Sequence, residues 1–313
     1  MNMHRGSQNL AIRALKDAAP YIRMYKGKTF VVKAGGGVFG DPVLTRALME
    51  QVSILYYMGV KVVMVHGGGP QLTEVEGALG VQSRMVQGRR VTDEKSIEVT
   101  SMVLSGLINT RILAACRELE VQAVGLSGVD AGVVQAHKRP PVKLEGSSET
   151  VDYGLVGDID RIDTTPIRKL LDDGYMPVIS PLSADDRGTL LNINADTVAA
   201  AIGAALSAEK LILCTGAPGI LERLSDPGSL ISYTDLAGLE RLRESGAISD
   251  GMLPKTRAIE SAIRGGVRRV HVVSYSAPEG ILGEVFTNEG TGTLIVADAK
   301  AIPANEQLAA KAS

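Results

Sequence analysis

Two glycine triplets, each at the end of an apolar run, are the residues of this chain best suited to holding an anion. Residues 29–37 read TFVVKAGGG, with Lys33 before Gly35–Gly37, and residues 60–70 read VKVVMVHGGGP, with Gly67–Gly69. Glycines at the carboxyl end of a strand let the backbone approach a ligand and turn N–H groups toward it. Because the turns are alike and the first carries a lysine, we expect them to hold a transferable phosphate between them.

A second lysine and a cluster of amide and carboxylate side chains follow later. LNINADTVAAAIGAAL places Asn192 and Asn194 on one side of an extended segment and Asp196 at a helix start. An acid there can simply cap the helix, but three polar side chains exceed what one cap requires, which favours a functional role. The run SDGMLPK puts Lys255 at the start of another helix. The helix dipole disfavours a cation there unless an anion lies beside it; an ordinary exposed lysine is the alternative.

An arginine pair precedes a predicted helix. GRRVTD, residues 88–93, contains Arg89 and Arg90. Either could bind a carboxylate through its guanidinium fork, although solvated arginines are an equal alternative. Thr92 or Asp93 could cap the helix that begins near residue 94.

The histidines and cysteines point to structural roles. His66 adjoins the second glycine turn, and the four histidines form no catalytic set. Cys116 and Cys214 each lie in an apolar run, which predicts two buried reduced thiols. No CxxC motif or Cys/His cluster offers a zinc site.

Several function classes are disfavoured. The chain has no GxxxxGK[ST] motif, and neither turn fits GxGxxG with its later acidic residue. A net charge of −2, the absence of tryptophan and only three phenylalanines argue against a nucleic-acid partner. The first ten residues are too polar for a signal-peptide core, and no apolar stretch approaches the roughly 20 residues that span a bilayer. We therefore expect a cytoplasmic protein without a membrane partner.

The elements that must position these residues follow a regular rhythm. Strands are predicted near residues 28–33, 61–65, 121–126, 176–180, 210–214 and 269–274, and helices near 43–58, 70–79, 93–118, 164–173, 195–206, 235–244 and 254–264. This alternation predicts an α/β fold with a mostly parallel sheet covered on both faces, whose ligands bind beyond the strand ends.

Three segments fall outside this rhythm. Residues 8–24 form an amphipathic helix interrupted by Pro20, and a partner subunit could bury its apolar face. Residues 131–160 predict antiparallel hairpins at the sheet edge. Residues 299–313 predict a frayed tail.

An ordered set of motifs resembles the amino-acid kinase family and, within it, the acetylglutamate kinases. The pieces are KAGGG (33–37), HGGGPQ (66–71), GRRVTD (88–93), VGLSGVDAG (124–132), VGDI (156–159), MPVISPL (176–182), NINADTVAAAIGAAL (192–206), EKLILCTGAPGIL (209–221), DGMLPK (250–255) and GTGTLI (290–295). They span nearly the whole chain. The resemblance implies a three-layer αβα sandwich that transfers the ATP γ-phosphoryl to the side-chain carboxylate of N-acetyl-L-glutamate, the second step of arginine biosynthesis.

The resemblance also implies a division of the chain. Residues 1–26 would form an oligomerisation helix, 27–206 a lobe for the amino-acid substrate, 207–298 a lobe for ATP, and 299–313 a flexible tail. The first helix resembles that of the arginine-inhibited subclass, which implies a homo-hexamer built as a trimer of dimers.

Residue roles follow from the same resemblance. Lys33 and Lys255 would stabilise the moving phosphoryl from its two sides, and Asp196 would hold both lysines. Mg²⁺ would bridge the ATP phosphates without a dedicated protein site. The remaining implied contacts are Gly35, Gly36, Gly37 and Gly67 for the phosphoryl; Gly68, Gly69, Arg90, Asn192 and Asn194 for the substrate; Thr215, Gly216, Gly219, Gly251 and Met252 for the nucleotide; and Glu284 and Gly290 for an arginine effector.

Two residues depart from the family pattern. Gly216 stands where an aspartate is usual, and Asp250 stands where glycine usually precedes Gly–Met. These departures motivate a non-catalytic amino-acid sensor on the same scaffold as one alternative. The other alternative is a sister carboxylate kinase of the aminoadipate type.

Overall fold

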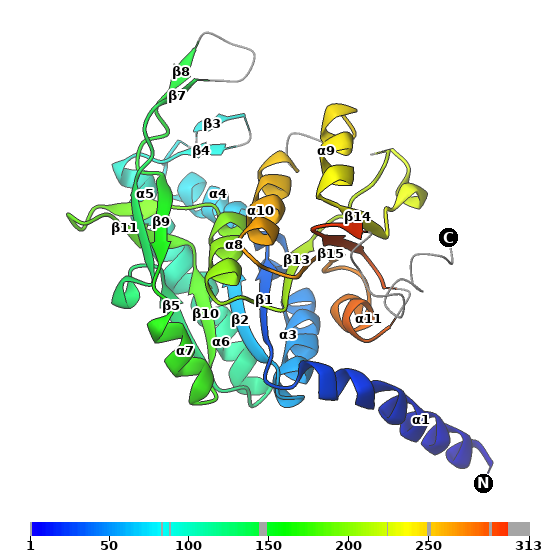
Figure 1. Ribbon diagram of the computed structural model, residues 1–313. Helices are drawn as coiled ribbons and strands as arrows, with labels where there is room; N and C mark the ends of the chain where they lie inside the picture. Colours follow the sequence, from blue (N-terminus) through cyan, green and yellow to red (C-terminus); the bar gives the residue numbers. More distant parts are fainter. Residues whose placement is uncertain are drawn as a thin grey trace.

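The structure is a computed structural model that describes residues 2–82, 84–87, 89–143, 149–223, 225–248, 252–287 and 290–299. Within these ranges, one large sheet has the strand order β14-β16-β15-β13-β1-β2-β10-β5 (Figure 1). Its strands are β1 (Thr29–Ala34), β2 (Lys61–His66), β5 (Ala123–Ser127), β10 (Met176–Ser180), β13 (Lys210–Thr215), β14 (Tyr233–Asp235), β15 (Arg269–Ser274) and β16 (Thr293–Val296). All pairings are parallel except that of β15 with β16.

Helices cover both faces of this sheet. The α-helices of the described residues are α1 (Asn2–Tyr25), which projects from the body, α2 (Gly36–Phe39), α3 (Pro42–Tyr57), α4 (Gly69–Ala78), α5 (Glu94–Ser101), α6 (Asn109–Glu118), α7 (Thr165–Asp172), α8 (Ala195–Ala205), α9 (Leu236–Glu244), α10 (Leu253–Arg264) and α11 (Gly280–Phe286). Strand β1 shows the layering, because Phe30 and Val32 pack with α3 and α6 while Val31 packs with α8 and α10. The three-layer αβα fold is confirmed.

A second sheet lies beside the first, with the order β12-β11-β6-β9. Its strands are β6 (Val134–Lys138), β9 (Gly157–Ile162), β11 (Leu182–Ala184) and β12 (Leu190–Asn192). The antiparallel pairing predicted for residues 131–160 is present between β6 and β9, but its expected place at the edge of the main sheet was wrong. Strand β11 follows β10 closely and pairs with β6, which draws this region into a sheet of its own.

Short hairpins and turns complete the chain. Strands β3 (Arg84–Val86) and β4 (Arg89–Val91) pair antiparallel, as do β7 (Val142–Lys143) and β8 (Thr150–Val151). One-turn 3₁₀ helices span η2 (Asp130–Gly132) and η3 (Pro227–Ser229). The predicted tail lies outside the described residues except for residue 299.

The helix predicted over 93–118 is present but interrupted by a π-helical segment, η1 (Met102–Ile108). By length and composition, residues 94–118 could cross a bilayer. In this fold the segment is a core helix, since Val103, Leu104, Ile108 and Ile112 are buried. Asp93 caps the start of α5, because its carboxylate accepts a hydrogen bond from the Ser96 backbone N–H at 2.8 Å. Of the two predicted capping residues, Thr92 and Asp93, the structure therefore selects Asp93.

The core also buries titratable side chains. Both cysteines are free and buried, as predicted, and burial raises the pKa of each to about 12. His271 Nδ1 lies 2.7 Å from Glu284 Oε1, and its Nε2 lies 3.0 Å from Lys210 Nζ. Burial, followed by the Lys210 charge, lowers the pKa of His271 to about 4, so the contact with Glu284 is a neutral N–H donating to a carboxylate. Burial likewise lowers the pKa of His66 to about 4.

These two histidines predict a pH dependence of stability. Their folded pKa lies below the unfolded value near 6.5, so protons favour the unfolded chain as pH falls below about 6.5. We expect the free energy of unfolding to drop between pH 7 and pH 5 by up to about 2 kcal/mol per histidine. Urea unfolding at both pH values measures this drop.

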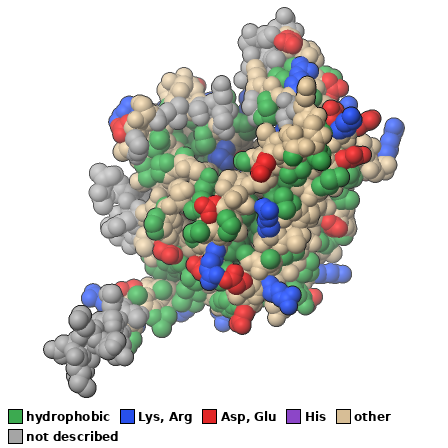
Figure 2. All heavy atoms as spheres, turned by 180° about the vertical axis from the view of Figure 1, so that it is seen from behind, with side chains coloured by type: hydrophobic (Ala, Val, Ile, Leu, Met, Phe, Trp, Pro, Cys, Tyr) green, Lys and Arg blue, Asp and Glu red, His purple; other side chains and the backbone are tan. Residues whose placement is uncertain are grey.

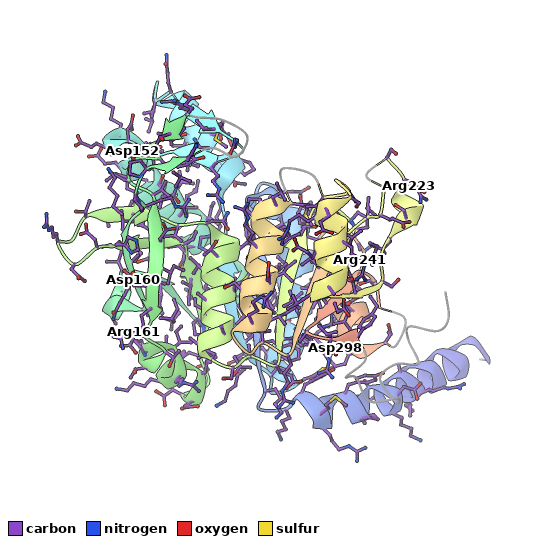
Figure 3. The ribbon with its side chains drawn as sticks, turned by 45° about the horizontal axis from the view of Figure 1, so that its top comes forward. Asp152, Asp160, Arg161, Arg223, Arg241 and Asp298 are labelled. Carbon is purple, nitrogen blue, oxygen red and sulfur yellow. The ribbon has the colours of Figure 1, made fainter. Side chains whose placement is uncertain are left out.

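The test variant is His271→Gln, which should remove about half of the drop. His137→Gln controls for the loss of an exposed histidine. His137 is exposed and pairs with Asp160 on β9 at the surface (Figure 3). Equal stability of the unmodified protein at the two pH values would contradict the assignment.

Candidate active site

The two glycine turns pack directly against each other. A Cβ atom on Gly36 would lie 2.8 Å from the Cα of Gly68 and 2.6 Å from Gln71 Oε1. One on Gly68 would lie 2.3 Å from Ile108 of the π-helical segment. Because Cβ atoms do not make contacts this close, only glycine allows β1, β2 and η1 to meet here. Gln71 ties the turns together by donating a hydrogen bond from Nε2 to the Gly36 carbonyl at 2.7 Å.

A cavity of about 490 Å³ lies beyond the carboxyl ends of β1 and β2, beside these turns. Most residues predicted from the sequence line it: Lys33, Gly35, Gly36, Gly67, Gly68, Gly69, Arg90, Asn192, Asn194 and Asp196. These positions come from segments that are up to about 160 residues apart in the sequence, and the parallel sheet brings them to one edge.

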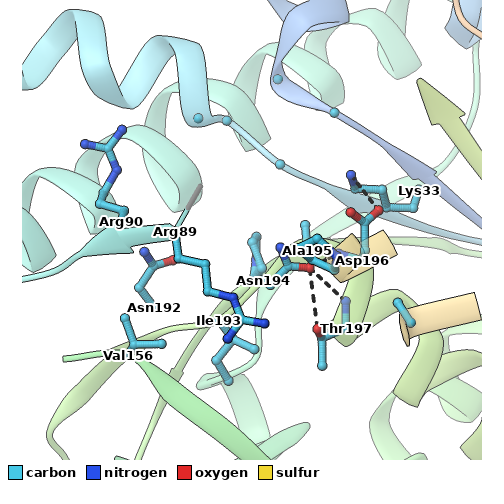
Figure 4. A pocket seen from close by; sticks show the side chains of 18 of the residues that line it. Lys33, Arg89, Arg90, Val156, Asn192, Ile193, Asn194, Ala195, Asp196 and Thr197 are labelled. Atoms are coloured by element: carbon cyan, nitrogen blue, oxygen red, sulfur yellow. Dashed lines mark hydrogen bonds and ion pairs between the residues drawn. The ribbon is translucent and has the colours of Figure 1, made fainter. Parts of the chain in front are cut away.

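One carboxylate lies between two ammonium groups. Asp196 Oδ1 is 2.8 Å from Lys33 Nζ and 2.9 Å from Lys255 Nζ, and all three residues are at most 9% exposed. Figure 4 shows the Lys33 contact. Burial alone would raise the pKa of Asp196, but the two ammonium charges outweigh it and hold that pKa at about 2. Burial, together with the charge of Lys33, lowers the pKa of Lys255.

The two asparagines have different surroundings. Asn194 caps α8, since its Oδ1 accepts hydrogen bonds from the backbone N–H groups of Asp196 at 2.9 Å and Thr197 at 3.1 Å. Capping by Asn194 leaves the Asp196 side chain for the lysines. Asn192 donates from Nδ2 to Thr92 Oγ1 at 3.3 Å and lines the cavity from β12.

The arginine pair divides between two environments. Alternation along β4 sends Arg89 across the cavity toward Ile193, while Arg90 points to another side, toward α4 (Figure 4). Arg90 forms an ion pair with the buried Glu76 and donates to Thr73 Oγ1 at 2.6 Å. Arg90 therefore lines the cavity with its positive charge already paired with Glu76.

Sequence reasoning missed other arginines of the cavity, Arg139 and Arg257. Burial, then the charge of Arg139, lowers the pKa of Arg89, and the charge of Arg257 acts in the same direction. Arg139 pairs with Asp158 at 2.6 Å. Arg257 follows Lys255 by two positions, which was a usable signal; nothing in the sequence distinguished Arg139. Asp196 is the one carboxylate among the described residues of the lining, so the cavity is strongly electropositive.

Several predicted residues lie outside this lining. Gly37, Thr215, Gly216, Gly219 and Met252 do not line the cavity, and Gly251 and Asp250 lie outside the described residues. Lys255 is also outside the lining and reaches the site only through its contact with Asp196. Thr215 and Gly216 follow β13, next to β1 in the sheet, and Thr215 Oγ1 donates to the Ala217 carbonyl at 2.9 Å.

The predicted effector residues are elsewhere, beside β15 and β16. Glu284 is 8% exposed, and its Oε2 accepts hydrogen bonds from the backbone N–H groups of Thr291 at 2.7 Å and Gly292 at 2.9 Å. A Cβ atom on Gly290 would lie 2.8 Å from the same oxygen. Both residues are therefore packed in one network with His271.

Among the described residues, no group of three or more His, Cys, Asp or Glu side chains could hold a metal ion. Asp196 is already engaged by two lysines. This donor set fits a metal that is bound through phosphate oxygens of a ligand and not through a protein cage.

Comparisons with known proteins agree on one family. The family model described as the amino acid kinase family matches residues 28–274. The chain is similar to proteins named acetylglutamate kinase from Myxococcus xanthus, with 47% identity over 93% of this chain and 96% of that one, and from Archaeoglobus fulgidus, with 40% identity over 91% and 98%.

Solved structures give a consistent picture. An N-acetylglutamate synthase from Neisseria gonorrhoeae, complexed with coenzyme A and N-acetyl-glutamate, superposes with a TM-score of 0.79 at 27% identity. The match covers 92% of this chain but only 64% of the synthase. A carbamate kinase from Giardia lamblia bound to AMP-PNP, at 19% identity and a TM-score of 0.60 over 87% of this chain and 99% of that one, shares the fold.

The lysine–aspartate–lysine cluster predicts a specific order of stabilities. Asp196→Asn leaves two buried ammonium groups without a carboxylate, which should lower the free energy of unfolding by about 3 kcal/mol. Lys33→Met leaves one ammonium paired with one carboxylate, so its loss should be clearly smaller. Urea unfolding at pH 7 compares the two variants, and an Asp196→Asn protein as stable as Lys33→Met would contradict the charge argument.

Proposed function

The chain belongs to the amino acid kinase family, and we propose that it transfers the γ-phosphoryl group of ATP to the side-chain carboxylate of N-acetyl-L-glutamate. The product would be N-acetyl-L-glutamyl 5-phosphate, formed in the second step of arginine biosynthesis in the cytoplasm. Support comes from the names of relatives that match over nearly their whole length.

The observation that carries the proposal is the Lys33–Asp196–Lys255 cluster beside the paired glycine turns. Phosphoryl transfer passes through a transition state whose charge is spread over oxygens, so position and charge compensation dominate catalysis. Lys33 would neutralise the moving phosphoryl from the β1 side and Lys255 from the α10 side. Asp196 keeps the two ammonium groups close enough to act on one phosphoryl. No covalent enzyme intermediate is required.

The electropositive lining suits two anionic substrates. Arg90 and Asn192 would bind the acceptor at its amino-acid end, with Asn194, Gly68 and Gly69 nearby. Arg90 would share its charge between Glu76 and the α-carboxylate of the acceptor. Arg89, Arg139 and Arg257 would raise the local concentration of anions in the cavity.

ATP would lie on the side of β13 and α10, with its phosphates over Gly35, Gly36 and Gly67. Thr215, Gly216, Gly219 and Met252 stay predicted nucleotide contacts. Mg²⁺ bound through the ATP phosphates would offset part of their charge, consistent with the lack of a carboxylate cluster among the described residues.

The two alternatives use the same phosphate machinery. A sister carboxylate kinase of the aminoadipate type and a non-catalytic amino-acid sensor would each keep Lys33, Asp196 and Lys255. The names of the relatives favour acetylglutamate as the acceptor.

A coupled assay of ADP release tests the function. The purified protein, with ATP and Mg²⁺, should turn over N-acetylglutamate in preference to glutamate, N-acetylaspartate and 2-aminoadipate. Lys33→Ala should lose most of kcat while staying folded, which assigns the activity to this chain. Turnover with another acceptor alone supports the sister kinase. Tight amino-acid binding without turnover supports the sensor.

We also propose that α1 joins copies of this chain into a hexamer. The helix projects from the body, most clearly in Figures 1 and 2, and is attached at its carboxyl end, where Tyr25 packs on Phe30 with ring centroids 5.2 Å apart. Ile12 and Leu15 are 54% and 64% exposed. A second copy of α1 would bury these side chains.

Deletion of residues 1–24 tests this assembly. The shortened protein should form dimers, while the full chain forms hexamers, because only α1 would connect the dimers. Light scattering coupled to gel filtration measures both masses. The double variant Ile12→Gln, Leu15→Gln should weaken the hexamer without shortening the chain. An unchanged mass after deletion would refute the role of α1.

We further propose that arginine inhibits the protein and that Glu284 and Gly290 contact it. A relative in structure, the gonococcal synthase, was also solved with coenzyme A and L-arginine. Here the Glu284 carboxylate already accepts hydrogen bonds from His271 and two backbone N–H groups. An arginine guanidinium would have to join or replace those donors.

A further inference from the structure

The side chain of Tyr275 lies between two segments with predicted ligand contacts, the one that follows β1 and the one that follows β13. Tyr275 directly follows β15, and its backbone N–H donates to the Thr215 carbonyl at 2.9 Å, which ties it to the end of β13. Its ring is partly buried and packs against the core on the α3 side of the sheet. The backbone and the ring therefore hold the hydroxyl group in one place.

Two glycines define that place. A Cβ atom on Gly37 would lie 2.5 Å from Tyr275 Oη, and one on Gly216 would lie 3.2 Å from it. The hydroxyl thus lies against the loop after β1 and the loop after β13 at once. These loops carry the predicted phosphate and nucleotide contacts.

The packing also accounts for Gly216, where the family resemblance implies aspartate. A Cβ atom would already press on the hydroxyl at 3.2 Å, so a larger side chain would have to displace Tyr275. The Tyr275 hydroxyl occupies the space that a side chain at position 216 would otherwise enter. Among the described residues, no group forms a hydrogen bond with Tyr275 Oη. The hydroxyl is also not one of the buried polar atoms that lack a partner, so it is not sealed inside the core. It can therefore donate to an incoming ligand.

We propose that the Tyr275 hydroxyl donates a hydrogen bond to a phosphate oxygen of the bound nucleotide. The inference rests on the proposed function only in taking ATP as the phosphoryl donor; it does not depend on the acceptor. Tyr275 is then a nucleotide-binding residue supplied by β15, and Gly37 and Gly216 are small because they make room for it.

Tyr275→Phe removes the hydroxyl and keeps the ring. A hydrogen bond to a charged oxygen is of the size that changes affinity about ten- to hundredfold. We expect titration calorimetry with ATP and Mg²⁺ to give a Kd raised by that factor, while the Kd for adenosine and the midpoint of thermal unfolding stay unchanged. Tyr175→Phe is the matched control, because Tyr175 is 40% exposed at the start of β10; it should bind ATP normally.

A double-variant cycle tests the geometry. Gly216→Ala should weaken ATP binding in the unmodified protein, since the new methyl presses on the hydroxyl. In the Tyr275→Phe background the nearest ring atom would be 3.7 Å away, an ordinary contact, so Gly216→Ala should cost little more. Additive losses would overturn the proposed placement.

The outcomes separate this inference from the function. Equal ATP affinity in Tyr275→Phe and the unmodified protein overturns the hydrogen bond and leaves the kinase proposal intact. An equal loss for adenosine and ATP shows a structural effect on the nucleotide loop and also overturns it. If the unmodified protein binds no ATP, both proposals fail.

Discussion

The site depends on one buried carboxylate that keeps two ammonium groups together. Lys33 and Lys255 come from two different elements, β1 and α10, and without Asp196 their charges would repel at short range with little water to screen them. The carboxylate is held in turn by its place in the first turn of α8, which Asn194 caps. The cluster keeps one net positive charge, which a phosphoryl group in transfer can compensate.

Close backbone approach is the second constraint. Gly36 and Gly68 bring the ends of β1 and β2 into direct contact, and the π-helical segment completes the packing against Gly68 through Leu104 and Ile108. A π-helical turn places residues at a spacing that a regular helix cannot, and such turns are frequent at functional sites.

Much of this was accessible from the sequence. Six of the eight strands of the main sheet were predicted from periodicity, and the burial of both cysteines from the apolar runs around them; β14 and β16 were missed. The convergence of Lys33, Asp196 and Asn192 was implied by the family resemblance. The π-helical segment was not accessible, because residues 94–118 read as one continuous apolar helix. Nor was the second sheet as a separate unit, because two of its strands, β11 and β12, have only three residues and carry no recognisable period. The directions of Arg89 and Arg90 depend on strand β4, which is too short to recognise.

The charge of the cavity lining also bears on which ligands it can bind. The described lining carries Lys33 and four arginines, Arg89, Arg90, Arg139 and Arg257, against one carboxylate, Asp196. Glu76 and Asp158 lie outside the lining and match two of these charges, but burial and neighbouring cations still lower the pKa of Arg89. Concentrating like charges in this way costs stability, and an anionic ligand recovers that cost when it binds. Negatively charged substrates should therefore stabilise the folded chain, because they offset the repulsion between the cations of the lining.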